Sequence, residues 1–304
     1  MPRERETKPG RPHRLRGLVS TSNLIWQLAP RPLVAWLLAR RLRRAEERWL
    51  FIVGVNNSGT TLLWELLRAH PAIAGMAREG QFGTWALPEP MEYGVPRIWT
   101  ERSAVFRWRE DDGEGADPKR VRFDWIWRMR GLDGARYLLE KSPPSCLRAR
   151  WLQRHFAGAT FIVVTRSPYA VAEGVRRRHG VSITRAAAHW ARAYEAVLED
   201  LPHLERQLVV SYEELAAQPE ATLARVTSFL GLPPLAGEVT RGAQRVHNAD
   251  EAASVIRDFN AGSLARLAPD DVTAITALTG EVMARLGYAP VEPAPASRSD
   301  GVRG

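Results

Sequence analysis

The chain has 304 residues, 45% of them hydrophobic, enough to form the core of one large α/β domain or two small ones. Its longest apolar stretches run to about seven residues, far short of the ~20 that a membrane-spanning helix needs, and its single cysteine, Cys146, excludes an internal disulfide. The net charge is +9, and most of it lies in residues 1–48, which hold twelve Lys or Arg against four Asp or Glu. A nucleic-acid-binding protein carries its basic surface on the folded domain instead. We therefore expect a soluble, cytoplasmic protein without a nucleic-acid partner.

The N-terminal segment divides into two parts. Residues 1–20 are rich in Pro, Gly and Arg and are predicted to be a disordered basic tail. Residues 21–48 are predicted to be helical. Within them, LVAWLLA leads into RRLRR, a pattern typical of a helix on an anionic membrane surface and equally of a helix packed on the core with a solvated basic end. Peripheral membrane contact is therefore one of two expectations for this segment.

Residues 49–290 are predicted to form a single domain, followed by a disordered tail at 291–304. Three apolar runs have the composition of buried strands and are each followed by a helical pattern: 49–55, 159–165 and 207–212. Such alternation predicts an α/β fold, with a central parallel sheet flanked by helices. Further helices are expected at about 182–204 and 270–286.

Residues 88–135 interrupt this alternation. They are rich in Trp, Arg, Asp and Gly and are predicted to be an insertion or lid within the domain. Tryptophan rings in such a segment either stack on an acceptor such as a sugar or pack into the core. The residues in question are Trp99, Trp108, Trp125 and Trp127.

The stretch FIVGVNNSGTTLLWELL, residues 51–67, contains a strand, a turn and a helix in the order that forms phosphate-binding loops. The turn aims consecutive backbone N–H groups at one point, and the helix adds the positive end of its dipole. Gly54 to Thr61 match a Walker A loop except that Thr60 replaces the lysine. Because nucleoside triphosphate hydrolysis depends on that lysine and on Mg²⁺, an ordinary NTPase or kinase is disfavoured. If the loop binds no ligand, the alternative interpretation is a strand-to-helix turn in which Ser58 or Thr60 caps the helix.

A second anion site is predicted at the end of the strand 159–165, where Arg166 precedes a Ser-Pro helix start. The carboxyl ends of parallel strands are where α/β sheets bind ligands, and an arginine there can hold a phosphate through two hydrogen bonds. Taken alone, Arg166 fits a strand-end ion pair equally well. Together the two sites predict a ligand with two separate anionic groups, and Arg166 is then expected close to the bend at Ser58 and Gly59.

These segments together resemble the sulfotransferase family that uses 3′-phosphoadenosine 5′-phosphosulfate (PAPS), over about residues 49–288. The resemblance rests on the order and spacing of SGTTLL and HP, EKSP, FIVVTRSPYAV, YEEL with FLGLP, and a final M-x-x-L-G-Y. It implies the P-loop-like sulfotransferase fold, PAPS as the donor co-substrate without a metal, and transfer of a sulfuryl group to a hydroxyl of an acceptor.

The resemblance also implies site residues. Arg166 matches the arginine that holds the 3′-phosphate, usually with a serine eight residues later, where this chain has Gly174. Tyr212 matches a tyrosine near the adenine, and Glu79 resembles the general base of the carbohydrate and tyrosyl-protein branches. The loop that cradles the 5′-phosphosulfate corresponds to Asn56, Asn57, Ser58, Gly59, Thr60 and Thr61.

The main departure from the family is Asn57, which stands where a Lys or Arg normally precedes Ser-Gly-Thr. Sulfuryl transfer builds charge on the bridging oxygen of the leaving phosphate, and Asn57 offers a hydrogen bond there but no charge. Lys141 of EKSP is the first candidate to supply the missing cation, since glycan-type members place a lysine from that turn beside the sulfate. Arg78 is the second. The plainer interpretation of Lys141 is a surface lysine paired with Glu140.

Two further residues have competing interpretations. Glu79 is predicted to be the general base, and its alternative is an ion pair with Arg78 or with a helix end. His70 is predicted to be structural, capping the turn into the next strand. No pair of histidines or cysteine has metal-ligand spacing, so no metal is predicted.

The acceptor is predicted only by class, as a glycan, a glycolipid or a small metabolite with a hydroxyl group. Because Asn57 and Gly174 depart from the family pattern, a non-catalytic phosphoadenosine-nucleotide-binding protein of the same fold is the alternative to an enzyme.

Overall fold

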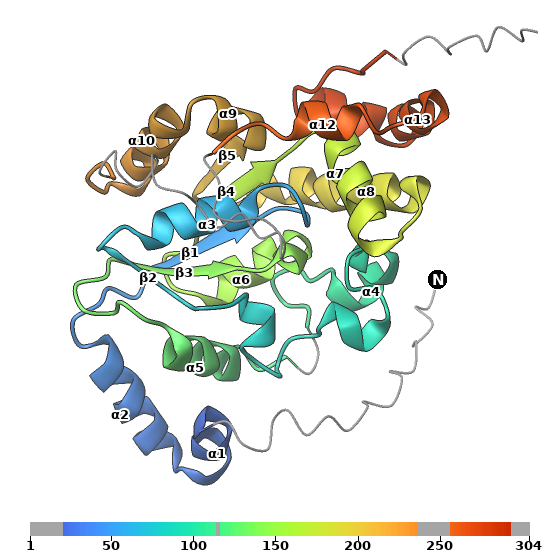
Figure 1. Ribbon diagram of the computed structural model, residues 1–304. Helices are drawn as coiled ribbons and strands as arrows, with labels where there is room; N and C mark the ends of the chain where they lie inside the picture. The colour runs from blue at the N-terminus through green and yellow to red at the C-terminus, as the bar shows by residue number, and fades with distance from the viewer. Residues whose placement is uncertain (1–20, 114–115, 236–255, 293–304) are drawn as a thin grey trace, which may run out of the picture.

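The computed structural model describes residues 21–113, 116–235 and 256–292. The predicted disordered tails, 1–20 and 291–304, lie outside the described residues apart from residues 291 and 292. At the centre is a five-stranded sheet with parallel pairings throughout and the strand order β2-β3-β1-β4-β5 (Figure 1). The strands are β1 Trp49–Val53, β2 Ile73–Gly75, β3 Tyr137–Lys141, β4 Thr160–Thr165 and β5 Gln207–Ser211. The predicted α/β fold with a central parallel sheet is confirmed.

Two of the five strands were not predicted. The expected strands at 49–55, 159–165 and 207–212 are β1, β4 and β5, each within two residues of its predicted bounds. β2 has only three residues, and β3 ends in the charged pair Glu140 and Lys141, so neither presents a long apolar run. β3 lies between β2 and β1, which brings the residues at its end next to the loop that follows β1.

Both faces of the sheet are buried, which explains the continuous apolar strands. Successive side chains of β1 point to opposite faces. Trp49, Phe51 and Val53 belong to the larger apolar core, while Leu50 and Ile52 belong to a smaller core on the other face. Burial on two faces is typical of parallel sheets covered by helices on both sides.

The smaller core is completed by α3, α9 and α10, and the larger one by α2, α5, α6, α7, α8 and α13. The expected helices at 182–204 and 270–286 are α8 and α13. The helix bounds are α1 Thr21–Leu28, α2 Arg31–Leu42, α3 Thr60–Arg68, α4 Ser103–Phe106, α5 Pro118–Arg128, α6 Ala149–His155, α7 Pro168–His179, α8 Ile183–Asp200, α9 Tyr212–Ala217, α10 Pro219–Leu230, α12 Asn260–Leu264 and α13 Pro269–Arg285.

The segment 88–135, predicted as an insertion or lid, contributes several buried side chains to the larger core. Trp99, Trp108 and Trp125 are buried, and Trp127 is partly buried against the larger core. The Trp99 indole donates to Asn56 Oδ1 at 3.2 Å, and the Trp125 indole donates to the Gly80 carbonyl at 2.9 Å. Of the two alternatives for these rings, packing into the core is the one found for the buried three, and two of them also donate to a hydrogen-bond partner inside the fold.

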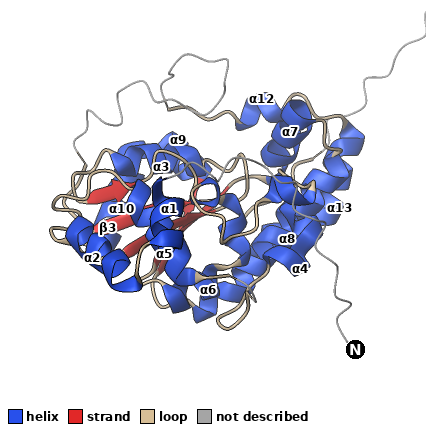
Figure 2. Ribbon diagram, turned by 90° about the horizontal axis from the view of Figure 1, so that it is seen from below, coloured by secondary structure: helices blue, strands red, loops and turns tan. Residues whose placement is uncertain are grey.

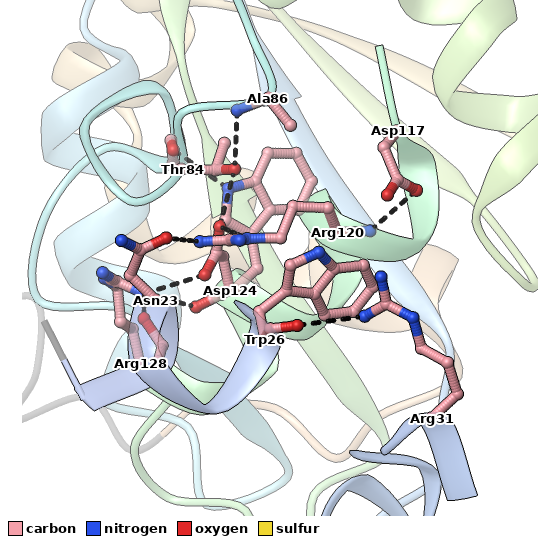
Figure 3. Close-up of polar contacts among 12 residues, drawn as sticks. Asn23, Trp26, Arg31, Thr84, Ala86, Asp117, Arg120, Asp124 and Arg128 are labelled. Atoms are coloured by element: carbon pink, nitrogen blue, oxygen red, sulfur yellow. Dashed lines mark hydrogen bonds and ion pairs between the residues drawn. The ribbon is translucent and has the colours of Figure 1, made fainter. Parts of the chain in front are cut away.

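The N-terminal helices α1 and α2 pack against α5 and lie at the opposite end of the molecule from α7, α8 and α13 (Figures 1 and 2). A polar cluster joins α1 to α5 (Figure 3). The buried Asp124 carboxylate accepts from Arg120 Nε at 2.7 Å and from Thr84 Oγ1 at 2.9 Å, and Arg120 Nη2 donates to Asn23 Oδ1 at 2.9 Å. Of residues 21–48, predicted to be helical, α1 and α2 cover residues 21–28 and 31–42. Within the part of the chain that the structure describes, no helix combines the length and apolar character needed to cross a bilayer.

Candidate active site

The loop after β1 has the form of an anion-binding turn. Asn57 and Gly59 adopt left-handed backbone conformations with φ of 68° and 94°, and α3 begins directly afterwards at Thr60. Ser58 Oγ donates back to the Val55 carbonyl at 2.7 Å, and no side chain caps the first turn of α3. Capping by Ser58 or Thr60, which the alternative without a ligand assumed, is therefore not found. Among the described residues, no side chain accepts from the backbone N–H groups at the start of α3, which favours an anion.

Two glycines in this loop are required by close approach. A Cβ on Gly59 would lie 2.7 Å from the Tyr212 ring, and a Cβ on Gly54 would lie 2.5 Å from the Val164 carbonyl oxygen of β4. Both distances are too short for a side chain without movement of the neighbour. The glycines thus let the loop pack directly against β4 and the start of α9.

Arg166, at the end of β4, binds the loop directly. Its Nη1 donates to the Asn57 carbonyl at 2.9 Å, its Nε donates to Asn260 Oδ1 at 2.8 Å, and its guanidinium lies 4.0 Å from the centre of the Tyr212 ring. The predicted proximity of Arg166 to the Ser58 bend is confirmed. Among the residues that the structure describes, none forms an ion pair with it, so the strand-end ion pair is not found.

The electrostatics of Arg166 also favour an anion. Burial lowers the pKa of its guanidinium, because removal from water penalises the charged form. An anionic ligand beside the guanidinium would offset this penalty. Tyr212 is fixed beside it, since its hydroxyl donates to the Arg257 carbonyl at 3.0 Å and accepts from Phe259 N at 3.2 Å.

Lys141 lies beside the same loop, at the end of β3. Its side chain is only 3% exposed, and its Nζ donates to Thr61 Oγ1 at 3.1 Å and to Glu79 Oε1 at 2.5 Å. The interpretation as a surface lysine paired with Glu140 is therefore wrong. The pairing of Ile52 with Lys141 across β1 and β3 accounts for the position, because neighbouring parallel strands end at the same edge of the sheet.

Glu79 pairs with Lys141 and is held by a second contact. Its Oε2 accepts from Gln81 Nε2 at 2.5 Å, and its side chain is 22% exposed, so it is accessible from outside. Arg78 instead points its guanidinium over the Phe82 ring, 5.3 Å from the ring centre. The alternative of an ion pair between Glu79 and Arg78 is not found, and Arg78 forms no hydrogen bond or ion pair with the described residues of the loop after β1.

The backbone around Glu79 is tied to the end of β3. Gly80 N donates to Glu140 Oε1 at 3.0 Å, and Gln81 N donates to Ser142 Oγ at 2.9 Å. Burial raises the pKa of the Glu140 carboxyl to about 7, although the Ser142 hydroxyl and Gly80 N–H stabilise its charged form. These bonds fix Glu79 relative to Lys141, since both neighbours of Lys141 hold the segment that carries Glu79.

The remaining predicted residues occupy two places. Asn57 turns its side chain toward α7, where its Oδ1 accepts from Arg178 Nη1 at 2.8 Å and its Nδ2 lies beside Gly174. His70 is structural as predicted: its Nδ1 accepts from Ala72 N at 3.1 Å, at the entry to β2. The described residues contain no cluster of three or more His, Cys, Asp or Glu side chains arranged for a metal ion.

Sequence reasoning missed three residues of this site. Asn260 orients Arg166 from α12, Arg178 binds Asn57 from the last turn of α7, and Gln81 binds Glu79. Asn260 follows Arg166 by 94 positions, and Arg178 follows Asn57 by 121, so no local pattern links them. Gln81 could have been found from the sequence, because it lies two residues after Glu79, the predicted base.

Comparison with known proteins agrees with this geometry. The model of the Sulfotransferase family matches residues 50–236. Protein-tyrosine sulfotransferase 1 of Danio rerio is 26% identical over 266 residues, covering 79% of this chain and 72% of that protein, and protein-tyrosine sulfotransferase A of Caenorhabditis elegans is 25% identical over 276 residues, covering 80% and 67%. The sulfotransferase domain of the Synechococcus PCC 7002 olefin synthase has the same fold, with a TM-score of 0.57 at 20% identity, over 81% of this chain and 96% of that domain.

The family match covers more than half of the chain and includes the loop after β1, Lys141 and Arg166. The sheet order, the anion-binding loop and the arginine bound to it agree with that match. This chain belongs to the sulfotransferase family.

Proposed function

We propose that the protein transfers the sulfuryl group of PAPS to a hydroxyl group of an acceptor. The observation that carries this proposal is the hydrogen bond from the Arg166 guanidinium to the Asn57 carbonyl, because it brings two anion-binding features into contact. A nucleotide with a 5′-phosphosulfate and a 3′-phosphate has two anionic groups to match them. The loop amides of residues 56–61 would hold the first group and Arg166 the second, with Tyr212 near the adenine.

In the proposed reaction the acceptor oxygen attacks sulfur as the bond from sulfur to the bridging phosphate oxygen breaks, and 3′-phosphoadenosine 5′-phosphate (PAP) leaves. Glu79 takes the proton of the acceptor hydroxyl. Lys141 supplies positive charge beside the loop, where negative charge develops on the leaving oxygen. Its contacts with Thr61 and Glu79 support this role, since they link the donor pocket to the base.

The same contacts favour an enzyme over a non-catalytic nucleotide-binding protein. The non-catalytic alternative rests on Asn57, which brings no charge to the loop. Lys141, at the end of β3, places a buried ammonium group beside the first turn of α3, so a positive charge is available there although Asn57 has none. The acceptor is proposed to be a tyrosyl or sugar hydroxyl: the similar proteins named above are protein-tyrosine sulfotransferases, and the position of Glu79 resembles both branches.

The test has two stages. Titration of PAP into the full chain by calorimetry is expected to show binding, and PAPS consumption is then followed with tyrosyl peptides, glycans and simple alcohols. Glu79→Gln is expected to keep PAP affinity and lose turnover. Binding of PAP without turnover on any acceptor would favour the non-catalytic alternative, and absence of PAP binding would overturn the proposal.

We further propose that α1 and α2 contact an anionic membrane surface. Four large apolar side chains are exposed on these helices: Leu24, Leu28, Leu33 and Trp36, of which Leu28 is 78% and Trp36 is 55% exposed. Arg40 lies over the Trp36 ring, and a groove beside α2 is lined by Arg40, Arg41, Arg43 and Arg44 together with Asp133, which pairs with Arg44. Apolar side chains next to a basic groove suit the acyl region and the phosphates of a lipid surface.

Sedimentation of the full chain with vesicles tests this contact. Vesicles containing phosphatidylglycerol are expected to bind it and vesicles of phosphatidylcholine alone are not, with weaker binding at high salt. Trp36→Ala is expected to weaken binding about ten-fold, from the lost burial of one large apolar side chain. Leu278→Ala is the control, because Leu278 is 43% exposed on α13, at the opposite end of the molecule from α1 and α2. Equal binding to both kinds of vesicle, or an equal loss in the two variants, would contradict the proposal.

A further inference from the structure

We propose that Glu213 is a positioning residue of the donor site, which sets the direction of the Arg166 guanidinium through the side chain of Asn260. The inference rests on the proposed function and adds to it two residues that act through Arg166. Glu213 follows Tyr212 in α9, and Asn260 is the first residue of α12. Two helices that are distant in the chain thus meet the end of β4 at this arginine.

A continuous chain of hydrogen bonds runs from Glu213 to Arg166. Asn260 Nδ2 donates to Glu213 Oε1 at 2.6 Å, and Arg166 Nε donates to Asn260 Oδ1 at 2.8 Å. A carboxylate only accepts hydrogen bonds, and a guanidinium only donates them. The amide between them satisfies both only with its nitrogen toward Glu213 and its oxygen toward Arg166. Glu213 therefore fixes which end of the Asn260 amide faces the guanidinium.

Glu213 is itself held in place by two further donors. Its Oε1 also accepts from Ser167 N at 3.0 Å, and its Oε2 accepts from the Tyr288 hydroxyl at 3.0 Å. Because Ser167 directly follows Arg166, the carboxylate binds the backbone next to the arginine as well as the Asn260 amide. Asn260 is buried, so its amide is largely shielded from water that would compete for these bonds. A carboxylate with three fixed donors has little freedom to turn.

The neutral amide keeps the charge of Arg166 available for a ligand. Asn260 transmits a hydrogen-bond direction from Glu213 without bringing a negative charge into contact with the guanidinium. A carboxylate in direct contact would form an ion pair with Arg166 and compete with an anionic ligand. Nε is bound to Asn260 and Nη1 to the Asn57 carbonyl, while Nη2 donates to none of the described residues. The arrangement leaves a fixed, charged guanidinium with one nitrogen available to a phosphate group.

Calorimetric titration of the full chain with PAP and with adenosine 5′-phosphate tests the inference, because the two nucleotides differ only in the 3′-phosphate. Wild-type protein is expected to prefer PAP. Glu213→Ala is expected to weaken PAP binding about ten-fold, the effect of one misdirected charge-assisted contact, and to change adenosine 5′-phosphate binding by less than about three-fold. Glu213→Gln is expected to stay within about three-fold of wild type, since its amide oxygen can still accept from Ser167 N and Asn260 Nδ2.

Glu214→Ala is the matched control. Glu214 is the next residue of α9, and its carboxylate accepts from Ser211 N at 3.1 Å and from Arg225 Nη2 at 2.9 Å. The variant removes the same group and weakens the start of the same helix, but it leaves the bonds of Glu213 in place. Its free energy of unfolding is expected to fall, while its PAP affinity is expected to stay within about three-fold of wild type.

Asn260→Ala tests the middle of the chain of hydrogen bonds and does not depend on whether Glu213→Ala folds. It is expected to lose PAP affinity to the same extent, and the losses in the double variant are expected to be less than additive. Unchanged PAP affinity in Asn260→Ala, an equal loss for both nucleotides, an equal loss in Glu214→Ala, or additive losses would overturn the inference. A Glu213→Gln variant as weak as Glu213→Ala would also overturn it. These results leave the proposed function standing, which fails if wild-type protein does not bind PAP.

Discussion

Replacement of Lys141 by methionine tests whether the buried ammonium group supplies the charge that Asn57 lacks. Methionine has a similar volume, so the packing near the Trp64 ring, 5.6 Å from Nζ, is largely kept. What is lost is a cation 3.1 Å from Thr61 Oγ1 in a site where Lys141 is only 3% exposed. Glu79 loses its ion-pair partner but stays partly exposed and bound to Gln81, so the variant is expected to fold.

The expected effect is a fall in kcat of about 10²- to 10³-fold, or about 3 to 4 kcal/mol, the size seen when one stabilising group facing developing charge is removed. PAP affinity is expected to fall as well, because PAP carries the leaving phosphate oxygen and the negative charge that develops there. The assay is single-turnover and steady-state PAPS consumption with the best acceptor, alongside calorimetry with PAP.

Arg78→Met is the control for this experiment. Arg78 was the other candidate cation in the sequence, and its guanidinium lies over Phe82 instead of facing the loop. Its kcat is expected to stay within about three-fold of wild type. Unchanged kcat and PAP affinity in Lys141→Met, or equal losses in the two variants, would refute the reasoning that Lys141 replaces the loop cation.

Three further predictions concern the loop, α7 and the end of β3. Gly59→Ala places a Cβ on a left-handed backbone, 2.7 Å from the Tyr212 ring. It is therefore expected to reduce the free energy of unfolding by about 1 to 3 kcal/mol, measured by urea denaturation, and to weaken PAP binding, measured by calorimetry. Gly174→Ser places its Cβ at ordinary contact distance from the Asn57 amide and offers that amide a hydrogen-bond acceptor. It is therefore expected to raise the free energy of unfolding by about 1 kcal/mol. A free energy of unfolding below that of the wild type would show that α7 has no room for the serine side chain. The pKa of Glu140 is raised to about 7 in the folded state. Between about pH 4.5 and 7 the folded protein therefore binds more protons than the unfolded chain. The contribution of Glu140 to stability is lost as the pH rises through this range. Glu140→Gln is expected to flatten the decline, and identical pH profiles of the free energy of unfolding in the two proteins would contradict it.

Local pattern was sufficient to predict the parts of the site that lie within one strand, turn or helix. The loop from Gly54 to Thr61 is recognisable because a buried strand, a tight turn and a helix start follow one another within a few residues. Arg166 is recognisable for the same reason at the end of β4. Such features depend on backbone geometry and burial over short stretches, which the residue types specify directly.

The tertiary structure decided which of those parts meet and what they bind. The placement of β3 beside β1 brings Lys141 to Thr61, and with it the pairing of Lys141 with Glu79. The direction of the Asn57 side chain toward Arg178 depends on how α7 crosses the loop. These contacts join residues from 62 to 121 positions apart, and their partners are chosen by strand order and helix packing. Hydrophobic periodicity indicates which face of an element is buried, but not which other element covers it. The sequence alone therefore determined the anion-binding turn and the fold class. The assembled sheet determined which residues meet at the site.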